Sequence, residues 1–86
     1  MRRLGLKVTV RYFAAAADAA GREEELLEFG AGATLHDLKS ALTDRYGAAM
    51  SKVVNSGSFL VDRVVRRDPA HPLTDRVDVL PPFAGG

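Results

Sequence analysis

The sequence predicts an α+β fold in which one main helix packs across a mixed sheet of about five strands. Residues 6–13 and 76–80 alternate between apolar and polar side chains, which is the period of a half-buried strand. Residues 35–46 instead carry apolar side chains at helical spacing. Short apolar stretches supply the remaining strands. We therefore divide the chain into a single domain over residues 1–80 and an extended arm over residues 81–86.

The first third of the chain predicts a strand, a short helical turn and a second strand. One face of the first strand carries Leu6, Val8, Val10 and Tyr12. Residues 14–20 are almost all alanine, the best helix former, and Gly21 stands where a glycine ends a helix. Residues 22–29 are then expected to pair back on the first strand. We interpret the glutamates at residues 23–25 as a solvated strand edge rather than a metal site, because adjacent residues of a strand point to opposite faces.

The clearest helix is predicted over residues 35–46. Its apolar stripe consists of Leu35, Leu38, Leu42 and Tyr46. The hydroxyl of Thr34 can accept hydrogen bonds from the first-turn N–H groups, and Asp37 lies near the positive end of the helix. Gly47 follows the last residue and ends the helix.

The segment after this helix has fewer clear signals. Residues 48–54 are ambiguous and are compatible with a second short helix, whereas residues 55–57 predict a turn. Two short strands are predicted at residues 59–61 and 64–65, joined by a turn at the two residues between them.

Composition excludes several classes of protein. With 86 residues, the chain has room for one core, and a net charge of +1 with scattered charges gives no reason to expect a nucleic-acid partner. We interpret Arg63, Arg66 and Arg67 as a solvated hairpin edge. No apolar run approaches the ~18 residues of a spanning helix, so no membrane association is expected. The absence of cysteine fits a reducing compartment, and we expect a cytoplasmic protein.

The chain has no self-contained catalytic site that its sequence would reveal. Neither His36 nor His71 has a second ligand at metal-binding spacing, and no glycine-rich phosphate loop is present. No serine has a recognisable base partner. We therefore expect no bound metal or cofactor, and any chemistry requires a second protein.

The most distinctive segment is the arm, Pro81, Pro82, Phe83, Ala84, Gly85 and Gly86. The prolines cannot donate backbone hydrogen bonds, so they stop sheet pairing and favour an extended chain. At ~3.3 Å per residue the arm reaches roughly 20 Å. Glycines without a Cβ can pass a narrow channel and leave a terminal carboxylate open to attack. Such an arm can thread the active site of another protein.

Two segments carry a resemblance to a known family. Residues 79–86, VLPPFAGG, resemble the C-terminus of the small, sulfur-carrier subunit of molybdopterin synthase, the MoaD type of the MoaD/ThiS family of ubiquitin-like carriers. Residues 8–15, VTVRYFAA, resemble the first strand of this family. The resemblance covers essentially the whole chain in order and length. It implies the β-grasp, or ubiquitin-like, fold, in which the last strand pairs in parallel with the first.

The resemblance also implies a reaction sequence in molybdenum cofactor biosynthesis. An ATP-dependent activating enzyme adenylates the carboxylate of Gly86, and a persulfide donor converts the glycyl adenylate to a thiocarboxylate. The arm then enters the large catalytic subunit of molybdopterin synthase, in an α2β2 heterotetramer. There the terminal sulfur attacks a pterin precursor.

The family's functional residues can be carried over to this sequence. Gly86 bears the sulfur, Gly85 fits the channel, and the arm also contains Ala84, Phe83, Pro82 and Pro81, with Leu80 at its base. Phe59, Leu60 and Val61 either form an exposed apolar patch that contacts a partner or belong to the core. Two features depart from the family pattern: an extra Gly-Asp turn before the last strand is missing, and residues 2–5 match nothing.

Other functions remain open at this point. The same carrier chemistry could serve thiazole or cysteine synthesis. Alternatively, Gly86 could be joined to a lysine of a target protein, as in a ubiquitin-like modifier, or the arm could belong to a docking domain that forms no covalent bond. Deleting Gly86 would abolish the function of a carrier or a modifier but not that of a docking domain.

Overall fold

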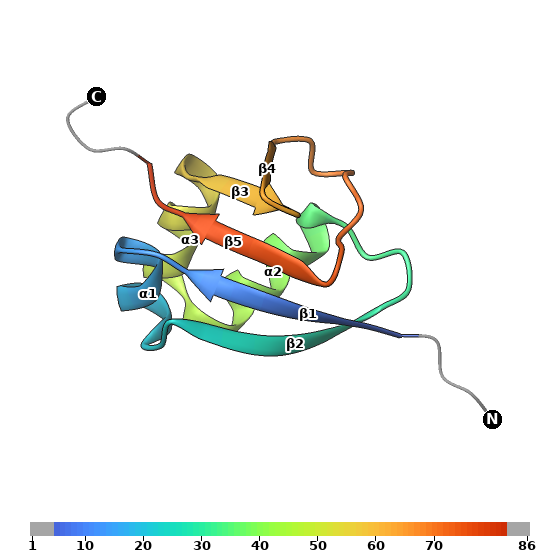
Figure 1. Cartoon of the computed structure of the whole chain (residues 1–86). Helices are drawn as coiled ribbons and strands as arrows, with labels where there is room; N and C mark the ends of the chain where they lie inside the picture. The colour runs from blue at the N-terminus through green and yellow to red at the C-terminus, as the bar shows by residue number, and fades with distance from the viewer. Residues whose placement is uncertain (1–4, 83–86) are drawn as a thin grey trace.

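Five strands form one mixed sheet in the computed structural model, which describes residues 5–82. The order across the sheet is β2 (Glu24–Gly30), β1 (Gly5–Tyr12), β5 (Arg76–Leu80), β3 (Ser58–Val61) and β4 (Val64–Arg66). β1 and β5 are parallel, and the other neighbours are antiparallel. The first and last strands therefore lie side by side within the sheet (Figure 1). This is the predicted β-grasp fold.

Three helices lie on one face of the sheet (Figure 1). They are α1 (Ala15–Ala20), α2 (Leu35–Tyr46) and α3 (Ala48–Ser56). α2 has the predicted bounds, and α3 shows that the ambiguous segment is helical. The turn predicted at residues 55–57 is wrong for its first two residues, because α3 buries Met50, Val53 and Val54 and continues to Ser56. The N–H of Gly57 closes its last turn by donating to the carbonyl of Val53 at 2.7 Å.

The start of α2 is held by the loop that leads to β5. The N–H groups of Leu35 and His36 donate to the carbonyls of His71 and Pro69, at 3.0 and 2.9 Å. The N–H of Thr34 donates to the carboxylate of Asp37 at 2.8 Å. These bonds satisfy donors that the first turn of a helix leaves unpaired. They also fix the loop from which the last strand begins.

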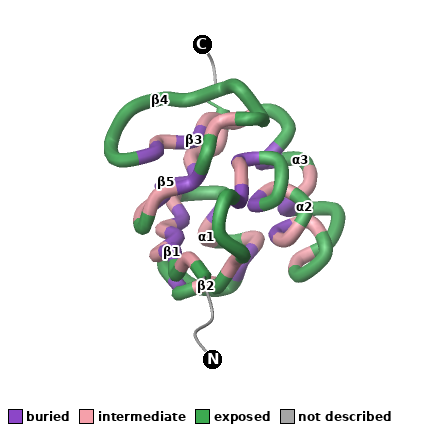
Figure 2. Tube along the Cα trace, turned by 90° about the vertical axis from the view of Figure 1, so that its right-hand side faces the viewer, coloured by how far each residue is buried: buried purple, intermediate pink, exposed green. Residues whose placement is uncertain are grey.

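The core lies between the sheet and the helices (Figure 2). Its largest fully buried side chains come from α2, α3, β1 and β5: Leu35, Leu38, Leu42, Met50, Val8, Val10, Val77 and Val79. We call this side of the sheet the covered face. Within residues 5–82 no helix lies over the opposite side, which we call the open face (Figure 1). The alternation predicted for β1 thus divides its residues between a core and a surface.

The hairpin of β3 and β4 forms one edge of the sheet. Its two connecting residues, Asp62 and Arg63, have φ values of 52° and 69°. Positive φ at both central positions is the geometry of a tight hairpin turn that matches strand twist. Arg63, Arg66 and Arg67 are exposed on or beside this hairpin, as predicted.

Candidate functional site at the base of the C-terminal arm

The arm leaves the sheet from its interior strand. β5 ends at Leu80, Pro81 is half-buried and Pro82 is exposed. Beyond the end of β1, the N–H of Phe13 still donates to the carbonyl of Val79 at 3.1 Å. Neighbouring backbone therefore holds the end of β5 at the base of the arm. The predictions for Phe83, Ala84, Gly85 and Gly86 lie outside the described residues.

Gly57 allows the backbone to approach the base of the arm closely. A Cβ at this position would lie 2.0 Å from the carbonyl oxygen of Leu80 and 2.8 Å from that of Val53. Both distances are shorter than real side chains tolerate, so residue 57 must be glycine for β5 and the end of α3 to keep their positions. The sequence suggested a glycine in a turn but not this contact, because Leu80 is far away along the chain.

The predicted apolar patch at residues 59–61 requires a correction. Phe59 and Val61 are each 3 % exposed and belong to the core, whereas Leu60 is half-buried on the open face. Consecutive residues of a strand point to opposite faces, so three adjacent residues cannot form one patch. Of the three, Leu60 alone remains a candidate for partner contact.

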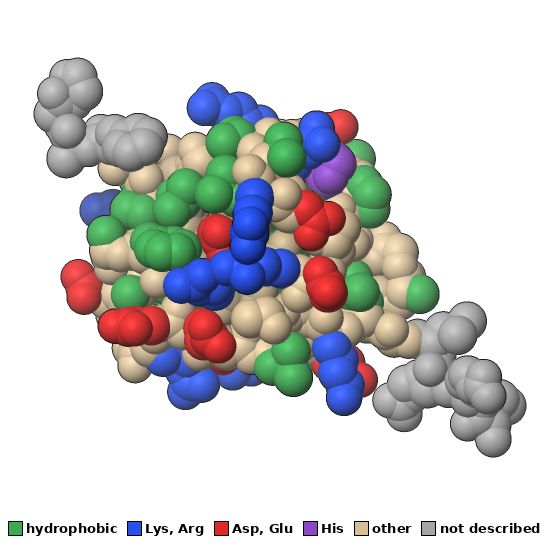
Figure 3. All heavy atoms as spheres, in the orientation of Figure 1, with side chains coloured by type: hydrophobic (Ala, Val, Ile, Leu, Met, Phe, Trp, Pro, Cys, Tyr) green, Lys and Arg blue, Asp and Glu red, His purple; other side chains and the backbone are tan. Residues whose placement is uncertain are grey.

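The open face does carry an apolar patch at the base of the arm, formed by other residues. Leu60 faces the same side as Val65, its partner across the hairpin, and it is a diagonal neighbour of Leu80 on β5. Phe13 lies beside Val79 and packs under the guanidinium of Arg11, 5.3 Å from the ring centre. We call Phe13, Leu60, Val65 and Leu80 the sheet-face patch. Figure 3 shows hydrophobic side chains gathered on this side of the molecule, near the end of β5.

Charged side chains border the sheet-face patch. Asp78 is 8 % exposed and lies between Arg11 of β1 and Leu60 of β3 in the strand register. The Nε atom of Arg76 is 3.8 Å from its Oδ1, which is too long for a hydrogen bond. Among the described residues, neither of these two buried atoms has a hydrogen-bond partner. The open face therefore combines an apolar patch with two buried polar atoms that lack hydrogen bonds.

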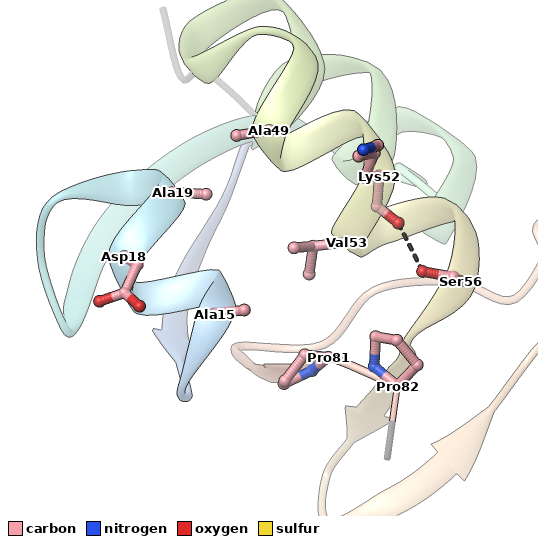
Figure 4. Close-up of a pocket in the computed structure, with 9 residues that line it drawn as sticks. All are labelled: Ala15, Asp18, Ala19, Ala49, Lys52, Val53, Ser56, Pro81 and Pro82. Atoms are coloured by element: carbon pink, nitrogen blue, oxygen red, sulfur yellow. Dashed lines mark hydrogen bonds between the residues drawn. The ribbon is translucent and has the colours of Figure 1, made fainter. Parts of the chain in front are cut away.

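A groove of about 440 Å³ flanks the arm on the helical side. It is lined by residues of α1, α3 and the arm: Ala15, Asp18, Ala19, Ala49, Lys52, Val53, Ser56, Pro81 and Pro82. Figure 4 shows Val53 pointing into the space between the two helices and the proline rings. The base of the arm thus has an apolar surface on each side, the sheet-face patch and this groove.

Comparison with known proteins then identifies the family. The model of the ThiS family matches residues 10–86, which include the last residues of β1, the whole of β5 and the arm. The chain belongs to the ThiS family. Among curated proteins, no sequence matches it significantly.

Solved structures agree with this assignment to the ThiS family. Subunit 1 of a molybdopterin converting factor from Pyrococcus furiosus is 28 % identical, with a TM-score of 0.77 over 91 % of this chain and 99 % of that one. The small archaeal modifier protein 1 of Methanosarcina acetivorans is 25 % identical, with a TM-score of 0.75 over 95 % and 98 %. A complex of subunits 1 and 2 of the molybdopterin-converting factor from Helicobacter pylori contains a chain with the same fold, at 19 % identity, a TM-score of 0.65, and coverage of 94 % and 100 %.

The interpretation of Glu25 as part of a solvated edge is wrong, because its side chain is buried. Its side chain is 5 % exposed on the covered face of this ThiS-family domain. One carboxylate oxygen accepts from the hydroxyls of Tyr12, at 2.5 Å, and Tyr46. The other lies 3.5 Å from Arg22 and 3.3 Å from Arg45. We call these five residues the Glu25 cluster.

The partners of Glu25 determine its protonation. Burial alone would raise the pKa of its carboxyl, but hydrogen bonds from Tyr12 and Tyr46 and the charges of Arg45 and Arg22 outweigh burial and lower it. Burial, followed by the hydrogen bond to Glu25, raises the pKa of the Tyr12 hydroxyl well above its ordinary value. The cluster thus holds an ionised carboxylate and a neutral phenol at neutral pH. Its position under the helices indicates a structural role.

The two histidines take part in the structure through their backbones. The N–H of His36 and the carbonyl of His71 belong to the contact that starts α2. Over residues 5–82, no group of His, Asp or Glu side chains could hold a metal ion. In the same part of the chain, no helix has the length and apolar character needed to cross a membrane.

Proposed function

We propose that this chain is a sulfur carrier that acts as the small subunit of molybdopterin synthase. The observation that carries the proposal is the match to the ThiS family through residue 86, where the segment after β5 has the sequence PPFAGG. The domain supports the proposal because it holds the base of that segment between two apolar surfaces. The resemblance to a converting-factor subunit from Pyrococcus furiosus supports this pathway.

The proposed chemistry takes place at the carboxylate of Gly86. A carboxylate oxygen attacks the α-phosphorus of ATP on an activating enzyme and releases pyrophosphate. The terminal sulfur of a persulfide displaces AMP from the glycyl adenylate, and a thiol reduces the resulting acyl disulfide to the thiocarboxylate. The large subunit then uses this sulfur as the nucleophile toward a pterin precursor. In a chain without cysteine, the terminus would be the single place for a sulfur nucleophile.

The two apolar surfaces support a role in binding the large subunit. Leu60, Leu80 and Phe13 are half-buried, and Val65 is 49 % exposed, so a partner that approaches along the arm would bury further apolar area. The complex from Helicobacter pylori pairs subunit 1 with subunit 2. By analogy, we propose a complex with a large subunit here, and the family resemblance implies that its stoichiometry is α2β2.

Intact mass spectrometry tests the carrier chemistry. The protein is incubated with an activating enzyme, ATP and a persulfide donor, and then treated with a thiol-specific alkylating agent. We expect an alkylated species in the full chain and none in a chain without Gly86. Alkylation is needed because oxidation of Met1 or Met50 adds nearly the same mass as the exchange of oxygen for sulfur. If competent enzymes give no alkylated species, the proposal that the chain is a sulfur carrier is wrong.

The pathway requires a separate test. The thiocarboxylate form is mixed with the large subunit of molybdopterin synthase and with the synthase that makes thiazole, in parallel reactions. We expect a stable complex on size-exclusion chromatography and transfer of sulfur with the first partner. Transfer with the second partner alone would keep the carrier chemistry but reject the proposed pathway.

A second candidate is a protein modifier, favoured by the likeness to the archaeal modifier from Methanosarcina acetivorans. In that case the activated carboxyl of Gly86 would form an amide bond with a lysine of a target. Adducts that resist reducing agents and contain a Gly-Gly remnant on lysine would support the modifier. Their absence from cells that contain the thiocarboxylate form would leave the carrier.

A further inference from the structure

A small polar pocket lies on the side of the domain formed by α2, the end of α3 and the β3–β4 hairpin. Its volume is about 250 Å³, and its lining consists of Leu35, Lys39, Val54, Asn55, Ser56, Gly57, Phe59, Arg66 and Arg67. Three of these residues are cationic, and none is acidic. The pocket shares Ser56 with the groove beside the arm, but it has no part in the function proposed above.

Two of the cations are neighbours of Phe59, one by strand pairing and one by contact with its ring. Arg66 is the cross-strand partner of Phe59, so both side chains leave the hairpin on the covered face. From α2, the Nζ of Lys39 lies 5.7 Å from the centre of the Phe59 ring. Phe59 is buried, and both Lys39 and Arg66 line the pocket with it. Arg67 follows directly and completes the lining.

This arrangement leaves positive charge uncompensated. In the described part of the chain, no carboxylate comes within 4 Å of Lys39, Arg66 or Arg67, although Arg11, Arg22, Arg45 and Arg76 all have such a partner. Like charges that converge in a concave site repel one another, and a bound anion removes that repulsion. Guanidinium and ammonium groups donate charge-assisted hydrogen bonds to oxyanions.

We propose that Lys39, Arg66 and Arg67 form a binding site for a single phosphate group. Three cations without an acid match a doubly charged phosphate better than a singly charged carboxylate. The volume admits one such group with few further atoms, since sites for larger ligands usually exceed about 300 Å³. The phosphate can be free inorganic phosphate or the terminal group of a phosphorylated molecule, and the cations are the same for both.

The site can be tested by titration with inorganic phosphate. Amide NMR spectra record the binding, the ionic strength is kept constant, and chloride is the reference anion. We expect saturable shifts at Asn55, Gly57 and Arg67 in the wild type. Lys39→Gln and Arg66→Gln should each weaken binding roughly tenfold, because each removes a charge-assisted hydrogen bond. Arg63 lies on the same hairpin but does not line the pocket. Arg63→Gln removes one positive charge, as the other two variants do, but this variant should bind phosphate with the affinity of the wild type.

The same variants separate phosphate binding from a structural role at the end of α3. That helix has no basic residue in its last turn, so nearby cations could stabilise its carbonyl end instead. If Lys39→Gln and Arg66→Gln lower the unfolding temperature while phosphate causes no saturable shift, the site is wrong. The proposed site is also wrong if Arg63→Gln weakens phosphate binding as much as Lys39→Gln and Arg66→Gln do.

Titration with AMP identifies the source of the phosphate group. Tighter binding of AMP than of inorganic phosphate indicates a phosphorylated ligand, and equal binding indicates the free ion.

Discussion

The covered face and the open face of the sheet are built from alternate residues of the same strands, yet they differ in what they hold. The covered face buries valines and leucines, and its buried carboxylate, that of Glu25, has four partners. The open face keeps Leu60 and Leu80 half-buried, and two of its buried atoms, Arg76 Nε and Asp78 Oδ1, have no hydrogen-bond partner among the described residues. The buried carboxylate of the covered face is therefore fully paired in the isolated domain, whereas the open face has polar atoms to which a partner could still form hydrogen bonds.

The largest expected effect comes from Phe59, whose neighbour Leu60 faces the other way. Phe59→Ala should lower the free energy of unfolding by about 3–5 kcal/mol, because it removes a buried ring and leaves a cavity. Denaturant unfolding followed by circular dichroism measures this loss. Equal losses for Phe59→Ala and Leu60→Ala would mean that the two faces do not divide as described.

A smaller effect is expected at Gly57, where the end of α3 meets the last strand. Gly57→Ala should cost about 1–3 kcal/mol, because its Cβ would overlap the backbone of Leu80. Gly30→Ala is the matched control, since a Cβ there meets nothing within 4 Å and φ is not positive, and its cost should stay within about 0.5 kcal/mol. Thermal unfolding compares the two variants. If both glycines tolerate alanine, the close approach at Leu80 has no energetic consequence.

The charge on the covered face makes stability depend on pH. The folded pKa of Glu25 lies below its ordinary value, so its contribution is present at neutral pH, begins to fall near the unfolded value of about 4.3, and is lost as pH drops through the folded value. Glu25→Gln should cost about 1–3 kcal/mol at pH 7 and flatten this acid dependence. Unfolding measured from pH 7 to 3 tests both effects.

Glu24→Gln is the control for the pH experiment. The side chain of Glu24 is 62 % exposed, and its nearest cation, Arg11, is 3.8 Å away. We expect this variant to stay within about 0.5 kcal/mol of the wild type at every pH. An acid dependence that survives Glu25→Gln would have to come from another carboxylate.

A small effect on stability is expected for the partly exposed leucine of the open face. Leu60→Ala should change the free energy of unfolding by less than about 1 kcal/mol, since the side chain is already partly exposed. If the sheet-face patch binds the large subunit, the same change should weaken that complex by roughly fivefold or more. Calorimetric titration measures the affinity. An unchanged affinity would remove Leu60 from the interface.

The sequence predicted the helices and strands better than it predicted which face of the sheet each side chain occupies. Thr34, Asp37 and Gly47 are local signals, and α2 has the expected bounds. Arg76–Leu80 also forms the predicted last strand, because its alternation ends at two prolines. Residues 59–61 are all apolar, so no alternation shows which of them points inward. That choice depends on the pairing of β3 with β5, which is not a local property.

For a related reason, the burial of Glu25 could not be predicted from the sequence. Within its own segment it is one of three consecutive glutamates, and such a run is usually solvated. Its tyrosine partners lie 13 and 21 residues away in the sequence, on β1 and α2. Only the assembled fold brings them together. The residues of the sheet-face patch are likewise spread from Phe13 to Leu80.

The position of β5 has a mechanical consequence. A pull on the arm is transmitted to this strand, which is bonded to β1 on one side and to β3 on the other. Ladder hydrogen bonds run across the strands, so a load along β5 shears both ladders together instead of peeling off one bond at a time. If a partner draws the arm into a channel, as proposed above, the load on the arm falls on two strand ladders at once.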